Sequence, residues 1–247
     1  MFCINKDAEL TPTLLQKMMQ QFYTINRPKL QKYKDYYDGK QNILNKVYTD
    51  TSKPCNKTVT NFCSDIADSY DGYLASPSYI SYSSESDIED IMEVLDYNDY
   101  QAEDCDFMLD LMIYGVAAEL MYVDDEAKCR FKLIDPRTCF GVFDNTLNGD
   151  LMYFVRWYKA NDWDEGDLYN VDVYGDDIIK HYTMHGVSGF LQDAQFVQEE
   201  PNYFAQCPAN IAMLKDEKSI FDCIMSGQDT YNELLAGEVD DYSAFVD

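Results

Sequence analysis

The hydrophobic pattern of this chain changes its period near residue 117. Before that point apolar residues recur every three or four positions, as on one face of a helix, and after it they alternate with polar residues, as on a half-buried strand. No helical pattern separates the successive strands between residues 117 and 196, which excludes parallel β-α-β units. The sequence therefore predicts an α+β fold with N-terminal helices, then an antiparallel β meander, then a C-terminal helix.

The first two helices have clear end signals. Thr11-Pro12 is suited to begin the first, because a threonine hydroxyl can cap a helix whose first position is proline. Pro28 is expected to end or kink that helix, or to start a second one. Gly39 is expected to close the second, since glycine adopts the left-handed conformation that ends many helices.

Further helices are expected after a polar loop at residues 41–56. Asn56 should cap the third, and Ser76-Pro77 should break it. Ser86 or Asp87 should open the fourth, and the fifth should run from about Ala102 to Tyr114 and stop near Gly115. A final helix is expected over residues 217–235. The inward faces are predicted from helical spacing as Val59, Phe62, Cys63, Ile66, Tyr70 and Tyr73 in the third helix, and Ile88, Ile91, Met92 and Leu95 in the fourth.

Alternation and turn residues predict the strands. The acidic turn Asp124-Asp125-Glu126 lies between two alternating runs, which is typical of a β-hairpin. A short isolated strand is also expected at Tyr79–Ser83. The remaining strands are predicted over residues 117–123, 130–134, 139–143, 151–158, 168–174, 178–183 and 189–196.

Charge is distributed unevenly along the chain. There are 45 acidic and 19 basic side chains, a formal charge of −26. Residues 1–60 hold ten basic and five acidic residues, whereas no Lys or Arg occurs from Thr58 to Ala127. Phosphate binding by the whole surface is excluded, because it needs clustered Lys and Arg. The acidic body is typical of a solvated face, of a surface that lies near DNA without adhering, or of one that meets a basic partner.

No pattern of residues indicates catalysis or metal binding. The eight cysteines lack CxxC spacing and the chain has only two histidines, His181 and His185, so a structural zinc site is not expected. Asp162–Asp167 resembles a calcium loop weakly, but its glycine is at the wrong position and a polar turn fits better. The sequence predicts no catalytic, cofactor-binding or metal-ligating residue and no cofactor. No apolar run approaches the ~20 residues that span a bilayer.

Several stretches resemble segments of one known family, in the same order. They are Tyr36–Leu44 ("YYxGxxxIL"), Lys53–Phe62 ("PNNKIVxNF"), Asp65–Leu74 ("IVDxxxGYL"), Tyr114–Glu119 ("YGxAYE"), Ile134–Arg137 continued to Asp144 ("IDPRxxFxVYD"), and Phe221 with Asp229–Asn232 ("DAYN"). These patterns are similar to those of the portal proteins of tailed bacteriophages, in the class of long non-contractile-tailed phages of Gram-positive hosts. Each motif is short, and their common order carries the resemblance.

The resemblance implies a structural subunit and no enzyme. Portal proteins form a ring, usually a dodecamer, at one capsid vertex, where double-stranded DNA passes without specific binding. The implied partners are other copies of the chain, the terminase, capsid and scaffolding proteins, and head-completion or tail connector proteins, with no membrane. The implied location is the virion, after assembly in the host bacterial cytoplasm.

The resemblance also suggests a division of the chain. Residues 1–55 are expected to form an N-terminal helical segment and residues 56–235 the α+β wing domain. Residues 236–247 are expected to begin a segment that continues beyond this sequence, because family members go on into channel and clip regions.

The basic N-terminal part supplies candidate subunit-interface residues. Lys29, Lys32 and Lys34 are expected to pair with the acidic run of a neighbouring subunit, since residues 1–60 carry a net +5 and residues 61–247 a net −31. Two alternatives remain open. The chain could be another acidic capsid-associated adaptor or assembly protein, or an uncharacterised hydrolase that uses buried carboxylates.

Overall fold

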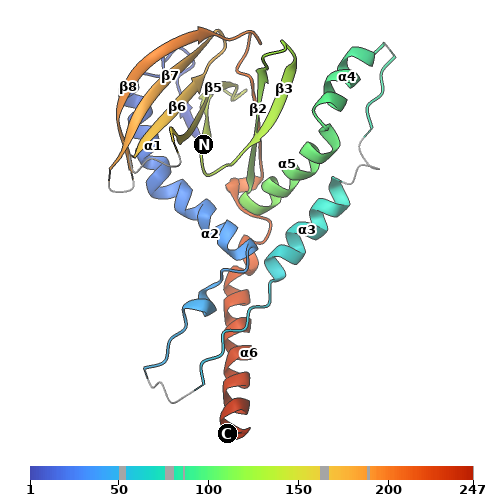
Figure 1. Cartoon of the computed structure of the whole chain (residues 1–247), viewed down its shortest axis with the longest axis vertical. Coiled ribbons are helices and arrows are strands. Elements are labelled where there is room, and N and C mark those ends of the chain that lie inside the picture. Colours follow the sequence, from blue (N-terminus) through green and yellow to red (C-terminus); the bar gives the residue numbers. More distant parts are fainter. Residues whose placement is uncertain (50–53, 76–80, 86, 162–166, 188–189, 247) are drawn as a thin grey trace. The chain divides into compact units, whose positions relative to one another are not determined.

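The computed structural model describes residues 1–49, 54–75, 81–85, 87–161, 167–187 and 190–246 (Figure 1). The chain forms two compact units, each assembled from separate segments. The first unit combines Met1–Leu30, Ser83–Glu103 and Ala117–Ala212, and the second combines Gln31–Tyr82, Asp104–Val116 and Met213–Asp247. Helices and strands both contribute, which confirms the predicted α+β class. The domain boundaries expected at residues 55 and 235 stay predictions.

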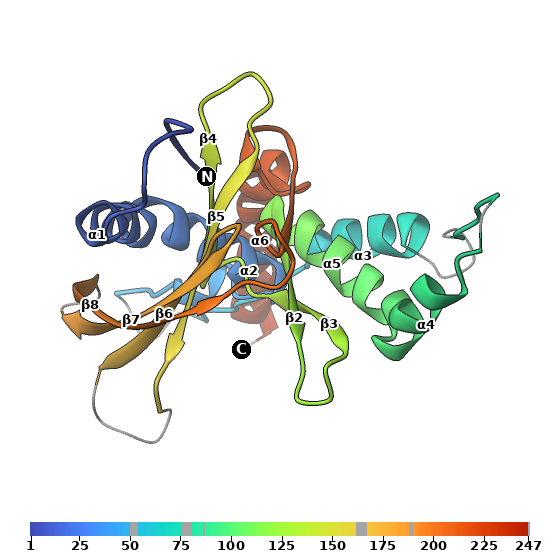
Figure 2. The same ribbon diagram turned by 90° about the horizontal axis from the view of Figure 1, so that it is seen from above.

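A six-stranded sheet dominates the first unit, and Figure 2 shows its strands fanning out in order. Five consecutive strands pair antiparallel, which confirms the meander. A first strand pairs parallel with β4 and was not predicted, because three residues are too few to show a period. The order is β1 (Phe2–Ile4), β4 (Cys139–Asp144), β5 (Leu151–Lys159), β6 (Leu168–Tyr174), β7 (Ile178–Val187) and β8 (Phe190–Pro201).

A second, three-stranded sheet contains the predicted hairpin. Strand β2 (Val116–Val123) pairs antiparallel with β3 (Cys129–Ile134), and its other neighbour is β9 (Ala209–Met213). The Asp124 carboxylate closes the hairpin turn, because it accepts from the backbone N–H groups of Glu126 and Lys128, both at 2.9 Å. The hairpin is confirmed, whereas β9 was missed because its five residues lack alternation.

Aromatic rings fill the space between the six-stranded sheet and helix α1 (Pro12–Gln21) with the π-helical turn Phe22–Asn26. The centre of the Phe22 ring lies 5.2 Å from that of Trp157 and 5.6 Å from that of Phe140. The Phe2 ring makes an edge contact with Phe140, with the ring centres 4.9 Å apart. All four side chains are buried. Burial of such rings is the main stabilising term of this unit.

The helix ends at the start of the chain follow their sequence signals. Thr11 caps α1 through its hydroxyl, which accepts from the Leu14 N–H at 3.3 Å. Pro28 lies at the second position of α2 (Arg27–Tyr37), but α2 follows the π-helical turn without a break, so Pro28 neither ends a helix nor starts a separate one. Gly39 has a φ of +74° and ends that helix as predicted. A 3-10 turn, Asn42–Asn45, follows in the segment expected to be a loop.

Helix α3 (Phe62–Leu74) begins later than expected. Its cap is Asn61, whose carbonyl oxygen accepts from the Ser64 N–H at 3.4 Å, and not Asn56. Asn56 is unavailable because its N–H groups donate to a distant carboxylate, described below. The predicted apolar stripe is also partly wrong. Cys63 and Ala67 are the buried residues of this helix, while the stripe residues Phe62, Tyr70 and Tyr73 are exposed.

Helix α4 (Glu89–Tyr97) fully buries none of its residues. Of the expected inward residues, Ile88, Met92 and Leu95 are half-buried, whereas Ile91 is 60% exposed. Polar contacts hold the C-terminal end of this helix to β3. The Asn98 amide donates to the Cys129 carbonyl at 3.1 Å and accepts from the Phe131 N–H at 3.2 Å. The Asp87 carboxylate accepts from the Glu89 N–H at 3.0 Å, as expected for a residue that opens the helix.

Helices α5 (Tyr100–Tyr114) and α6 (Met225–Val246) complete the fold. Gly115 ends α5 with a φ of +73°, as predicted. The last helix was expected at 217–235, but this was wrong at both ends. Short 3-10 turns occupy Lys215–Glu217 and Asp222–Ile224, and α6 then continues across residue 235.

Some expectations fall on residues outside the described ranges. These are the helix break at Ser76-Pro77, the alternative helix start at Ser86, and most of the Asp162–Asp167 turn. Of the expected strand Tyr79–Ser83, residues 81–83 are described and belong to no strand.

Candidate functional site

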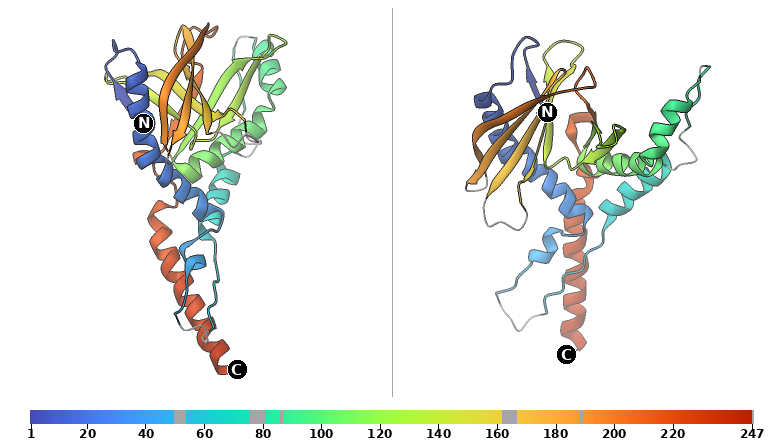
Figure 3. Two further views of the ribbon diagram at one scale, coloured as in Figure 1. Left: turned by 60° about the vertical axis from the view of Figure 1, so that its left-hand side comes forward. Right: turned by 45° about the horizontal axis from the view of Figure 1, so that its top comes forward.

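One face of helix α6 forms hydrogen bonds with the rest of the second unit. In Figure 3 the chain segments around residues 42–49 and 54–61 run along this helix in both views. We call the contacts between them the α6 polar network. It comprises Gln228, Asp229, Asn232 and Asp240 of α6 and their partners Tyr36, Gln41, Asn42, Lys46, Tyr48, Asn56, Thr60, Asn61 and Phe62.

The buried face of α6 has a four-residue spacing. Gln228, Asn232, Ala236 and Asp240 are all buried, and residues four apart lie one above the other on a helix. Three of these four side chains are polar. Since buried polar groups need partners, the segment that covers this face must supply donors and acceptors instead of apolar surface.

Two α6 side chains form hydrogen bonds with the backbone N–H and carbonyl groups of Thr60. The Asn232 carbonyl oxygen accepts from the Thr60 N–H at 3.0 Å, and the Gln228 amide donates to the Thr60 carbonyl. Gln228 also accepts from the Phe62 N–H at 3.2 Å. These side chains give the extended segment the hydrogen bonds that a neighbouring strand would otherwise supply.

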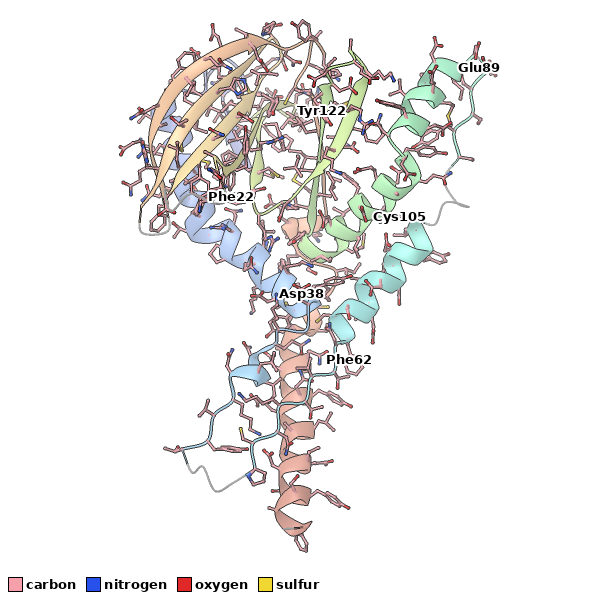
Figure 4. The ribbon with its side chains drawn as sticks, in the orientation of Figure 1. Phe22, Asp38, Phe62, Glu89, Cys105 and Tyr122 are labelled. Atoms are coloured by element: carbon pink, nitrogen blue, oxygen red, sulfur yellow. The ribbon has the colours of Figure 1, made fainter. Side chains whose placement is uncertain are left out.

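The network continues from Asn232 through two amide side chains. Asn232 donates to the Gln41 carbonyl oxygen, and Gln41 donates to that of Asn61 at 3.1 Å. Asn61 in turn donates to the Tyr37 backbone carbonyl at 2.7 Å while it caps α3. One connected chain of hydrogen bonds therefore links α6, the end of α2 and the start of α3 (Figure 4, where Asp38 and Phe62 mark these two ends).

A tyrosine and an asparagine both hold Asp229. The Tyr36 hydroxyl donates to its carboxylate at 2.6 Å, and the Asn42 amide donates to the same oxygen at 2.8 Å. Burial raises the pKa of Tyr36 well above its usual range, and the Asp229 carboxylate adds to this rise. Tyr36 therefore stays a neutral donor.

Asp240 receives the largest number of hydrogen bonds in the network. Its carboxylate accepts from the Asn56 backbone N–H at 2.6 Å, the Asn56 amide at 2.8 Å, the Lys46 ammonium at 2.9 Å and the Tyr48 hydroxyl at 3.1 Å. The Asn56 N–H bond and the Lys46 charge hold the pKa of Asp240 far below its usual range. Its ionised form therefore fixes the segment near residues 46–56 to α6.

The residues that carry the family resemblance meet in this network. Tyr36 and Ile43 come from the first motif, Asn61 from the second, and Asp229 and Asn232 from the last. Ile43 is buried and the others make the bonds above. From the sequence these residues belonged to separate short motifs, and the structure shows that they lie in one hydrogen-bonded network.

The network also contains residues that sequence reasoning missed. Gln41, Gln228 and Asp240 were not singled out. The available signal was the run of small or polar residues at positions 228, 232, 236 and 240, but hydrophobic periodicity does not score polar residues as buried.

The predicted interface lysines lie on α2 and are not part of the network. The Lys34 ammonium pairs with Asp38 at 2.7 Å in its own helix. Lys32 is exposed and lies 5.6 Å from the centre of the Tyr36 ring, and Lys29 is half-buried. Their role at a subunit interface stays a prediction.

The network fixes the backbone of the segments that cover α6. Its described residues do not form an arrangement of catalytic groups. Its carboxylates accept hydrogen bonds from amide groups, tyrosine hydroxyls and a lysine. The Cys63 thiol lies near Asp229, but burial and that carboxylate raise the pKa of Cys63 to about 11, so the thiol stays protonated and is a poor nucleophile. Among the described residues there is no cluster of His, Cys, Asp and Glu that could hold a metal ion. Within the same ranges, no helix has the length and apolar character needed to cross a membrane.

A family model described as "Phage portal protein, SPP1 Gp6-like" matches residues 19–247. The chain belongs to this family of tailed-phage portal proteins, which confirms the resemblance. The family is structural and not enzymatic, and it implies a location in the virion capsid. A comparison with curated proteins gave no match.

Proposed function

We propose that this chain is a subunit of the portal ring at one capsid vertex, through which DNA enters during packaging and leaves during ejection. The observation that carries the proposal is the family match over residues 19–247. We also propose that the ring is the docking platform for the terminase and the tail connector, that it contacts capsid and scaffolding proteins, and that it assembles in the host bacterial cytoplasm.

The charge distribution supports passage of DNA without binding. Residues 61–247 carry nine basic against forty acidic residues. A negative surface repels phosphate, so DNA that moves past it is not retained. The α6 polar network supports the mechanical part of the role, because most of its buried polar groups are hydrogen-bonded and such groups hold one geometry.

Electron microscopy and mass photometry of the whole purified protein test this function. We expect rings with a central hole and a mass of about a dozen subunits, as implied by the family. A protein that stays monomeric at all concentrations and hydrolyses a substrate would overturn the proposal and favour the alternative of an enzyme.

The candidate interface lysines have their own test. We propose that Lys29, Lys32 and Lys34 pair with acidic residues of a neighbouring subunit. Reversing all three charges, for example with Lys→Glu substitutions, should weaken ring formation, and added salt should weaken the wild-type ring. Ring formation that ignores both changes would exclude this pairing.

A further inference from the structure

Helix α6 has the reverse of the usual amphipathic arrangement. Its polar face is buried, as described above, while large apolar side chains lie on the opposite side. Tyr231 is 45% exposed, Leu234 66%, Tyr242 74% and Phe245 94%. Single exposed apolar residues are common, but a row of them on one helix face indicates a binding surface.

These four residues form one stripe. They are separated by three, eight and three positions, and such steps return to nearly the same side of a helix with 3.6 residues per turn. We call this stripe, Tyr231, Leu234, Tyr242 and Phe245, the outer face of α6. It continues at its N-terminal end into a hollow of about 670 Å³ lined by Phe62, Ile66, Ile224 and Tyr231.

The charge on α6 disfavours a second α6 as the partner of this face. Glu233, Glu238 and Asp241 are exposed on this helix, whereas Asp229 and Asp240 are bound within the network. Residues 225–247 contain no basic residue. Two such helices side by side would bring like charges together, which is destabilising. The partner surface must combine apolar side chains with positive charge.

The second unit carries one such surface on a different segment. Residues 40–49 and 54–57, here called the basic segment, contain three lysines and no acidic residue. Lys46 pairs with Asp240 of its own chain, Lys40 forms a salt bridge with Asp38 at 3.2 Å while staying exposed, and Lys57 donates to the Leu44 carbonyl at 2.8 Å. Through Lys46, Tyr48 and Asn56 one side of this segment binds α6 of its own chain. Its Val47 is 81% exposed and Leu44 40%, and Lys40 and Lys57 are exposed as well.

We propose that the outer face of α6 in one copy docks on the basic segment of a neighbouring copy. This inference rests on the proposed ring and names the two surfaces that join its subunits. The two surfaces differ, so the contact runs head to tail, which is the arrangement that closes into a ring. Aliphatic and aromatic side chains supply the buried area, and lysines opposite acidic residues supply the register.

Two double variants each disrupt one of the two surfaces and leave the other intact. L234S/F245S changes the outer face of α6, and L44S/V47S changes the basic segment; all four side chains are exposed, so the fold is expected to persist. Each variant alone should be monomeric, with association weakened about 100-fold or more. Mixed in equal amounts, they should form a heterodimer, because one intact outer face then meets one intact basic segment. Leu147→Ser, an exposed residue of the first unit, is the matched control and should assemble as the wild type does.

Sedimentation velocity of the whole protein distinguishes the outcomes. Rings from both double variants would overturn the inference and leave the proposed portal ring intact. A homodimer of L44S/V47S alone would also overturn it, because it would show an α6–α6 contact. A heterodimer from the mixture without wild-type rings would support the docking and count against the ring. Monomers in the mixture together with wild-type rings would show that other surfaces join the subunits.

Discussion

The first unit and helix α6 of the second unit are each stabilised by a different kind of interaction. In the first, Phe2, Phe22, Phe140 and Trp157 pack as rings between a helix and a sheet. In the second, the long helix α6 is attached by amides and carboxylates. Apolar packing is not directional and tolerates repacking, whereas a buried hydrogen-bond network accepts one geometry and loses free energy for every partner that is removed.

The comparison shows which unit is suited to which task. The first unit gains much of its stability from buried ring area. The second unit also buries apolar side chains such as Phe221 and Ile113, but its helix α6 turns polar residues inward, and this leaves apolar residues of α6 on the outside for other contacts. Four experiments test this difference, and they follow in order of decreasing expected effect.

Removal of a core ring should cost most. Phe154 is fully buried in a cluster with Leu120, Tyr174 and Cys207 in the first unit. Phe154→Ala should lower the free energy of unfolding by about 3–5 kcal/mol, because it removes apolar contact and leaves a cavity. Chemical denaturation measures the loss, and Leu147→Ala, at an exposed turn, should change stability by less than about 0.5 kcal/mol. Equal effects of both substitutions would contradict the described core.

The close approach at Gly115 should give the next effect. An added Cβ would lie 2.4–2.6 Å from backbone atoms of Lys218, and the φ of +73° is unfavourable for any other residue. Gly115→Ala should therefore cost about 3 kcal/mol. Gly237→Ala is the matched control, because nothing lies within 4 Å of its added Cβ inside α6. It should stabilise the protein by about 0.5–1 kcal/mol, and the opposite sign at either site would be inconsistent with this geometry.

The network should respond to the loss of a single amide. Asn232→Ala leaves the Thr60 N–H and the Gln41 carbonyl oxygen without their partner, so we expect a loss of about 2 kcal/mol. Glu233→Ala, on the exposed side of the same turn, should be nearly neutral. Hydrogen exchange adds a local measurement: the Thr60 amide should lose protection in the first variant and keep it in the second.

The pH dependence should be the smallest effect. The pKa of Asp240 is lowered by the Asn56 N–H and by Lys46, so its contribution to stability is complete above its unfolded value of about 4 and is lost as the pH falls below it. Thermal melts of the wild type should therefore decline below about pH 4, down to the lowest pH at which the protein stays folded, more steeply than those of Asp240→Asn. Asp241→Asn, on an exposed side chain, should follow the wild-type curve. Parallel curves for all three would remove Asp240 from the network.

Local signals predicted the parts of the fold that depend on neighbours in sequence. Thr11, Gly39 and Gly115 end helices as expected, because a cap or a left-handed turn needs only a few adjacent residues. The hairpin at Asp124 and the strands from β4 to β8 follow from alternation in the same way. Prediction failed at Asn56, which donates to Asp240 instead of capping a helix, while Asn61 caps α3.

By itself the sequence determined the α+β class, the antiparallel meander, the uneven charge and, through the order of its motifs, the portal family. Only the tertiary structure decided that α6 turns its polar residues inward and its apolar residues outward. The physical reason is distance along the chain. Thr60 lies 168 residues from Gln228 and Asn56 lies 184 from Asp240, and a hydrogen bond between such residues leaves no periodic trace in the sequence.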